Sequence, residues 1–311
     1  MQRADAWPAL PLPQWADTCA TLHLWFQIVG KIRLKQSPWI NHGWHVALYV
    51  TGRGLTTSPI PLDSRTFEIE FDFVAHRLEI KSSDGRTASM PLEPQSVATF
   101  YARLMSELAK LDIDVHIDRL PNEIADPIRF DRDDIHKSYD ADAANRFWRI
   151  LVQADRVFKE FRARFVGKSS PVHFFWGSAD LAVTRFSGKR APEHPGGVPH
   201  LPDWVAREAY SHEVISVGFW AGSGPIAYPA FYSYAYPAPD GFSKARVKPA
   251  AAFFSDDLKE FILPYDAVRE SASPDATLLD FLQSTYEAAA NLAQWDRAAL
   301  ERNGDPRQSH R

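Results

Sequence analysis

The feature that most constrains the fold of this chain is a pattern that occurs twice, 133 positions apart. Ser37-Pro38 is followed by Leu48-Tyr49-Val50-Thr51, and Ser170-Pro171 is followed by Leu181-Ala182-Val183-Thr184, so both segments repeat at one offset (170 less 37, and 181 less 48). Val-Gly-Lys precedes each copy, at 29–31 and at 166–168. Repetition at a fixed offset indicates that one structural unit is used twice. We therefore predict a chain of two similar halves.

Hydrophobic spacing predicts the α+β class, with an antiparallel sheet flanked by an N-terminal and a C-terminal helix in each half. Apolar residues recur at helical spacing over 17–35 and 95–111 in the first half, and over 141–166 and 275–300 in the second. Between these helices the period changes to two, which is typical of strands. The expected strands are 44–50, 67–73, 78–80, 86–92, 115–117, 171–177, 180–186, 212–220, 229–236, 250–254 and 260–264.

Composition shifts along the chain indicate the domain boundaries. A Pro/Asp-rich stretch separates the halves, and two loop insertions, 187–209 and 221–249, distinguish the second half from the first. Long loops in a compact domain are often functional. The predicted organisation is a first half at 1–117, a connector at 118–140, a second half at 141–302 and a disordered polar tail at 303–311.

Length and composition bound the class of protein. The 311 residues suffice for about two domains. A net charge of −4 lacks the basic surplus of a nucleic-acid binder, and no run approaches the ~20 apolar residues of a membrane span. The single cysteine, Cys19, excludes an intramolecular disulfide and a thiolate zinc finger. Without a secretory signal at its start, the chain is expected in the cytoplasm, with no nucleic-acid or membrane partner; its oligomeric state is left open.

The strongest group of candidate catalytic residues lies on the expected strands of the second half: His173, Arg185, His212 and Glu213. Strand alternation places Glu213 at the start of the more apolar face of 212–220. A carboxylate in apolar surroundings needs a partner, because its pKa otherwise rises. Arg185 or His173 could be that partner, and such a set suits acid–base catalysis. The alternative is a buried structural ion pair.

Two histidines six residues apart, His194 and His200, lie on the first loop insertion. With His173 or His212 they could hold a divalent metal such as zinc or iron. Their spacing matches no established metal motif, so a solvated loop with two incidental histidines is the alternative.

A third group, expected to bind a ligand, follows the Ser-Pro of each copy: His42, Trp44 and His45 in the first half and Trp176 in the second. The alternative is that both tryptophans belong to the core and that the histidines bond backbone groups. The aromatic run at 228–236 could line a pocket for an apolar or cationic ligand, or pack a sheet.

Several runs resemble a bacterial family of about three hundred residues that is known only as a domain of unknown function. The resemblance covers nearly the whole chain, to about Glu301, and implies no activity, cofactor or ligand. The runs that carry it are Trp7–Leu12, Trp39–Tyr49, Leu55–Pro61, Asn145–Trp148, His173–Gly177, Arg185–Gly188 and Tyr210–Glu213.

Three functions follow from these observations. The leading one is an enzyme that acts on a small molecule, with the 187–209 loop as its lid. The second is a non-catalytic protein that binds a small ligand in an aromatic cavity, and the third is a scaffold that binds another protein through 221–249. No Gly-x-Ser-x-Gly, Rossmann, Walker or His-Glu-x-x-His motif is present, which removes several common enzyme classes.

Overall fold

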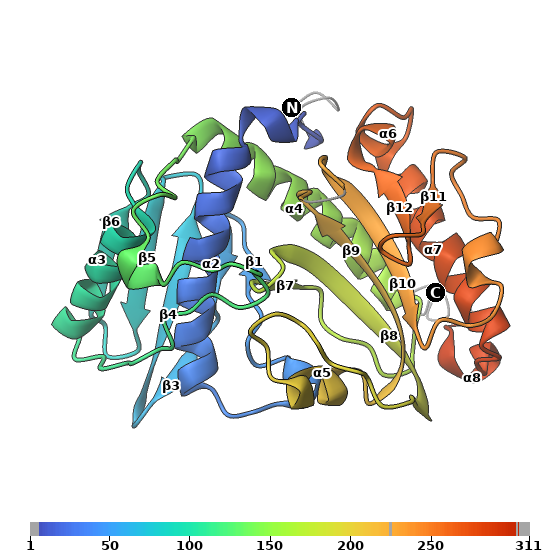
Figure 1. The fold of residues 1–311 in the computed structure, drawn as a ribbon, viewed down its shortest axis with the longest axis horizontal. Coiled ribbons are helices and arrows are strands. Elements are labelled where there is room, and N and C mark those ends of the chain that lie inside the picture. Colours follow the sequence, from blue (N-terminus) through green and yellow to red (C-terminus); the bar gives the residue numbers. More distant parts are fainter. Residues whose placement is uncertain (1–5, 224–225, 303, 305–311) are drawn as a thin grey trace, which may run out of the picture. The chain divides into compact units, whose positions relative to one another are not determined.

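The computed structural model describes residues 6–223, 226–302 and 304, and it has helices together with two antiparallel sheets of six strands each (Figure 1). The predicted α+β class is confirmed. The predicted disordered tail at 303–311 lies outside the described residues, apart from Gly304. Two compact units divide the chain. The first unit comprises Met1–Val152, His173–Asp180 and Pro195–Ala209, and the second comprises Gln153–Val172, Leu181–His194 and Tyr210–Arg311.

The first unit contains a sheet in the order β1-β2-β4-β5-β6, with β3 paired to β4. Its strands are β1 (Tyr49–Val50), β2 (Gly54–Thr56), β3 (Ile60–Leu62), β4 (Arg65–Asp72), β5 (Arg77–Ser82) and β6 (Thr87–Pro91), and β7 (His173–Phe175) bridges to Leu48. Its helical segments are η1 (Leu12–Gln14), α2 (Ala16–Gln36), η2 (Asn41–Gly43), α3 (Val97–Lys110), η3 (Phe130–Arg132) and α5 (Asp203–Ala209).

Aromatic side chains of α2, α3 and β4 form the core of the first unit. Strand alternation places Phe67, Ile69 and Phe71 on the buried face of β4. Phe26 of α2 meets Phe71 edge to face at 5.0 Å, and Trp25 stacks on Phe100 of α3 at 4.5 Å. The two helices therefore cover one face of the sheet (Figure 1).

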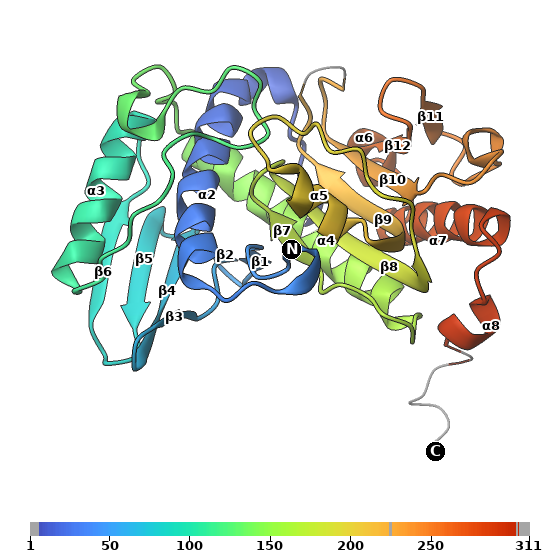
Figure 2. The ribbon, with the colours of Figure 1, turned by 60° about the horizontal axis from the view of Figure 1, so that its bottom comes forward.

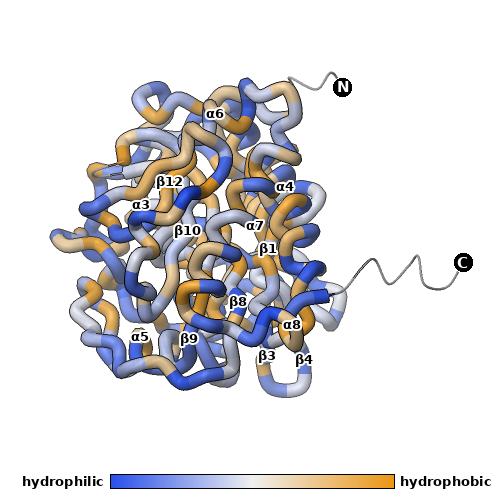
Figure 3. The backbone as a smooth tube through the Cα atoms, turned by 90° about the vertical axis from the view of Figure 1, so that its right-hand side faces the viewer, coloured by the Kyte–Doolittle hydropathy of each residue, from blue (hydrophilic) through white to orange (hydrophobic). Residues whose placement is uncertain are grey.

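The second sheet has the order β11-β12-β10-β9-β8-β7. Helix α7 packs against β9 and β10 (Figure 2). Helix α4 begins in the first unit and continues into the second. Hydrophobic and hydrophilic residues follow each other at short intervals along this helix, as expected for an amphipathic helix (Figure 3). The remaining elements are α4 (Ala141–Ala163), β8 (Asp180–Arg190), β9 (His212–Trp220), β10 (Ala230–Tyr236), η4 (Phe242–Lys244), β11 (Phe253–Ser255), β12 (Glu260–Pro264), α6 (Tyr265–Arg269), α7 (Pro274–Leu292) and α8 (Arg297–Leu300).

Four predicted elements differ from the structure. Residues 115–117 form no strand, although alternate side chains there are buried, because alternation reports one buried side and not hydrogen bonding to a neighbour. The strand expected at 44–50 is reduced to β1, since the preceding segment turns through η2 with His42 and Gly43 at positive φ. The 187–209 loop contains the end of β8 and α5, and the closing helix is broken into α7 and α8. None of the helices in the described ranges is long and apolar enough to span a bilayer. The duplication stays a prediction.

Candidate functional site

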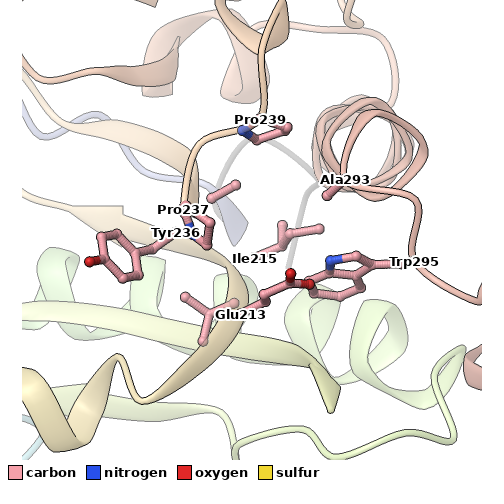
Figure 4. Close-up of a pocket in the computed structure, with 9 residues that line it drawn as sticks. Glu213, Ile215, Tyr236, Pro237, Pro239, Ala293 and Trp295 are labelled. Atoms are coloured by element: carbon pink, nitrogen blue, oxygen red, sulfur yellow. The ribbon is translucent and has the colours of Figure 1, made fainter. Parts of the chain in front are cut away.

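A small pocket lies in the second unit, where three segments meet (Figure 4). Its volume is about 140 Å³, well below the roughly 300–1,000 Å³ of pockets for drug-sized ligands. It therefore suits one functional group of a ligand. The lining residues are Glu213, Val214 and Ile215 of β9, Ala235 and Tyr236 of β10, Pro237 and Pro239 beyond it, and Ala293 and Trp295 beyond α7.

Strand register builds one wall of this pocket. Ile215 of β9 lies directly opposite Ala235 of β10, so both share a face of the sheet. Glu213 lies two residues before Ile215 and therefore projects from that same face. The tyrosine ring of Tyr236 points away from the pocket in Figure 4, and its hydroxyl donates to the carbonyl oxygen of Pro192 at 3.1 Å.

The end of α7 builds the other wall. The N–H of Ala293 still donates to Ala289, but Gln294 has a φ of 53°, which turns the chain out of the helix. The N–H of Trp295 then donates back to the carbonyl oxygen of Ala290 at 2.9 Å. This turn places the indole of Trp295, which is only 6% exposed, beside Tyr286 and against the pocket.

The carboxylate of Glu213 is the charged group of this pocket. It is half-buried and accepts a hydrogen bond from the hydroxyl of Ser187 on β8 at 2.8 Å. Among the described residues no cation forms an ion pair with it. The nearby ammonium of Lys189 instead donates to the carbonyl oxygen of Gln294 at 3.0 Å. A half-buried carboxylate whose partner is a neutral hydroxyl favours a cation from solution.

The structure gives the other three predicted catalytic residues separate surroundings. Arg185 is fully buried in the second unit, and its guanidinium donates to the carbonyl oxygen of Phe161. The Nδ1 of His212 lies 3.0 Å from the hydroxyl of Ser211, and its side chain projects from the face of β9 opposite to Glu213. His173 belongs to the first unit, where its ring lies 4.5 Å from that of Phe175. An acid–base role for these residues stays a prediction.

The two predicted metal ligands lie in different units. His194 stacks on Tyr210 in the second unit at 4.7 Å, and His200 lies in the first, where its carbonyl oxygen accepts a hydrogen bond from Asn122. In the parts of the chain that the structure describes, no three His, Cys, Asp or Glu residues are grouped as metal ligands. A zinc or iron site stays a prediction.

All four residues of the predicted ligand-binding group lie in the first unit. His42 donates through Nδ1 to the carbonyl oxygen of Ala209 at 3.0 Å, and its ring lies 5.2 Å from that of Trp44. Trp44 approaches His173 at 6.4 Å. The indole of Trp176 donates to the carbonyl oxygen of Val46 at 2.9 Å. His45 is buried, and its Nδ1 accepts the backbone N–H of Ile40 at 3.2 Å.

Sequence reasoning missed Trp295, Pro237 and Pro239 as pocket residues. Trp295 was included in a closing helix that was expected to continue to residue 300. The sequence signal that the helix ends before Trp295 is weak, because Asn291 and Gln294 are ordinary residues for a helix end. The two prolines lie in the expected loop insertion at 221–249, where nothing in the sequence distinguishes them as pocket residues.

A second titratable group lies in the first unit. Glu123 is placed over Gly177, where a Cβ would lie 1.9 Å from Oε1 of Glu123. Desolvation, together with a smaller contribution from repulsion by Asp180, raises the pKa of the Glu123 carboxyl from 4.5 to about 7. Between about pH 4.5 and 7 the Glu123 carboxyl is therefore protonated in the folded chain and ionised in the unfolded chain.

We therefore expect the free energy of unfolding to fall as the pH rises from about 4.5 to 7, because folding then requires proton uptake by Glu123. Urea unfolding at several pH values would measure this slope in wild type and in Glu123→Gln. In Glu123→Gln the free energy of unfolding should decline less between these pH values. The matched change Glu93→Gln, at an exposed site, should show the same decline as wild type. Equal slopes in all three proteins would contradict the assignment.

Comparison with known proteins adds the class of this chain. Residues 7–302 match the Family of unknown function (DUF5996), and the chain belongs to that family. No curated protein and no solved structure gives a significant match. The match extends from Trp7 to just beyond α8, and the family assigns no chemistry to the pocket.

Proposed function

We propose that this chain binds a small organic cation, with a methylated ammonium head group seated in the pocket of Figure 4. The observation that carries the proposal is the half-buried carboxylate of Glu213, which has no cationic partner among the described residues and which faces the indole of Trp295. Negative charge next to an aromatic face is the arrangement that proteins use for quaternary ammonium ligands.

The remaining lining favours methyl groups over N–H groups. Ile215, Ala293 and the two prolines present carbon atoms to the cavity, and proline has no backbone N–H. A ligand with several N–H donors would leave some of them without acceptors, at a cost of about 1–3 kcal/mol each. A methylated ammonium distributes its charge over methyl groups that pack against these walls. A primary amine should therefore bind more weakly.

Calorimetry with choline and its neutral carbon isostere, 3,3-dimethylbutan-1-ol, tests the proposal. The two probes have nearly the same shape, so their difference in affinity reports the charge. We expect choline to bind at least about tenfold more tightly than the alcohol, which is about 1.4 kcal/mol. Equal affinity would indicate an apolar pocket, and no binding of choline at millimolar concentration would refute the proposal.

Substitution of Glu213 gives the matching residue-level result. Glu213→Gln keeps the shape and the contact with Ser187 but removes the charge, and we expect it to weaken choline binding by about tenfold. Glu160→Gln removes the same charge from an exposed site on α4 and should leave the affinity unchanged. A loss of similar size in both variants would show that only the net charge of the protein matters.

A further inference from the structure

Two residues of the first unit that are in contact each carry a buried side-chain nitrogen without a protein partner. Arg33, in the last turn of α2, is 9% exposed, and His45 is 2% exposed. The Nη1 of Arg33 and the Nε2 of His45 are both buried and make no hydrogen bond. The residues are in direct contact, because Nε of Arg33 donates to the backbone oxygen of His45 at 2.6 Å. Buried polar groups are almost always satisfied, so two neighbouring exceptions require an explanation.

The hydrogen bonding of His45 determines whether its unpaired nitrogen, Nε2, is a donor or an acceptor. Its Nδ1 accepts the backbone N–H of Ile40 at 3.2 Å, so Nδ1 carries no proton. Burial lowers the pKa of His45, and the nearby Arg33 cation lowers it further, which holds the ring neutral. The proton of the neutral ring is then on Nε2. Nε2 is therefore a donor, as is Nη1 of Arg33.

Arg33 also lacks a counter-ion. No ion pair of Arg33 occurs within the described ranges, and its guanidinium carbon lies 5.5 Å from the centre of the Tyr49 ring. Glu208, an acidic neighbour of His45, is not an ion-pair partner of Arg33; its carboxylate accepts a hydrogen bond from the indole of Trp39. A buried cation without a counter-ion is unfavourable, and proteins normally pair such a charge.

We infer that Arg33 and His45 form a binding site for a small oxyanion, a carboxylate or a phosphate. The guanidinium would supply the charge and two of its N–H groups, and Nε2 of His45 a further donor. Two aromatic rings contact the site residues: Tyr49 lies 5.5 Å from the Arg33 guanidinium carbon, and Trp39 lies 4.4 Å from the His45 ring. These rings suit a ligand with a flat apolar body. This site is independent of the cation pocket.

Calorimetric titration of the full chain with benzoate, acetate and inorganic phosphate, and with chloride as a control, would measure the affinity for each anion. We expect at least one oxyanion to bind at least tenfold more tightly than chloride. Preference for benzoate would identify a carboxylate ligand, and preference for phosphate would identify a phosphate ligand. If no oxyanion bound at 20 mM (roughly the limit of a weak specific site), or if chloride bound equally, the inference would be overturned.

Two conservative variants locate the site. His45→Asn keeps an acceptor for the N–H of Ile40 but removes the Nε2 donor, and Arg33→Lys keeps the charge but removes the planar pair of donors. Each should weaken the preferred oxyanion by about tenfold. Arg103→Lys, at an exposed position on α3, should bind as wild type does. Thermal unfolding would confirm that each variant is folded, and wild-type affinity in both folded site variants would refute the assignment.

Discussion

Replacing Arg185 with alanine should lower the free energy of unfolding by about 3–5 kcal/mol, because the side chain is the centre of a buried aromatic cluster. Its guanidinium carbon lies 3.5 Å from the ring centroid of Phe161, 4.2 Å from that of Tyr286 and 5.0 Å from that of Phe165. Each ring contact is a cation–π interaction, which is strongest where water is excluded. Alanine would leave a cavity among three rings.

Electrostatics support the same conclusion. Burial lowers the pKa of the Arg185 guanidinium to about 10, and Tyr286 and Glu301 oppose this shift. The hydroxyl of Tyr286 donates to the carboxylate of Glu301 at 2.9 Å, and this hydrogen bond holds the carboxylate next to the aromatic cluster. Arg185 therefore stays charged at neutral pH with a counter-ion nearby.

Chemical denaturation of Arg185→Ala and Arg185→Met would separate packing from charge. Methionine fills much of the same volume without the cation, so Arg185→Met should recover part of the stability lost in Arg185→Ala. Wild-type stability in Arg185→Ala would contradict a structural role. Such a result would favour the catalytic role that the sequence predicts for this residue.

Replacing Gly30 with alanine should destabilise the protein by about 2 kcal/mol, although alanine is the better helix former by roughly 1 kcal/mol. Gly30 lies within α2, and a Cβ there would be 2.2 Å from the indole of Trp176. Trp176 has little freedom to move, because its indole donates to Val46 and only 6% of it is exposed. The cost of overpacking therefore exceeds the gain in helix propensity.

A double-mutant cycle tests this explanation. In Trp176→Leu the smaller side chain leaves room for a methyl group, so Gly30→Ala should be far less destabilising there than in wild type. Urea midpoints of the four proteins would give the coupling free energy. Equal costs of Gly30→Ala in both backgrounds would show that the indole does not limit this position.

The two glycines of the repeated Val-Gly-Lys illustrate how far sequence similarity extends. Gly30 faces Trp176, whereas a Cβ at Gly167 would lie 2.5 Å from Leu300 and 2.7 Å from Phe165. Both positions require glycine because another side chain is close, but the neighbours differ. The repeat places a glycine at both positions, but it does not indicate which side chains lie against them.

Local spacing determined much of the fold. The alternation of Phe67, Ile69 and Phe71 with acidic residues predicted β4 and its buried face, and the expected strand at 212–220 coincides with β9. These features depend on residues two to four positions apart, which the sequence shows directly. For the same reason the sequence placed Glu213 on an apolar face and indicated that it needs a partner.

The identity of that partner depended on the tertiary structure. Glu213 meets Ser187 from β8 and Trp295 from the turn after α7, while Arg185, which the sequence offered as its partner, packs among rings from α4 and α7. Likewise, the sequence indicates His45 as a ligand-binding candidate but gives no sign of Arg33, and only the tertiary structure shows that the two are buried in contact with unused donors. The sequence by itself determined the elements and their buried faces, because periodicity is local. Only the tertiary structure decided which side chains meet, because those contacts join distant segments whose packing no local pattern encodes.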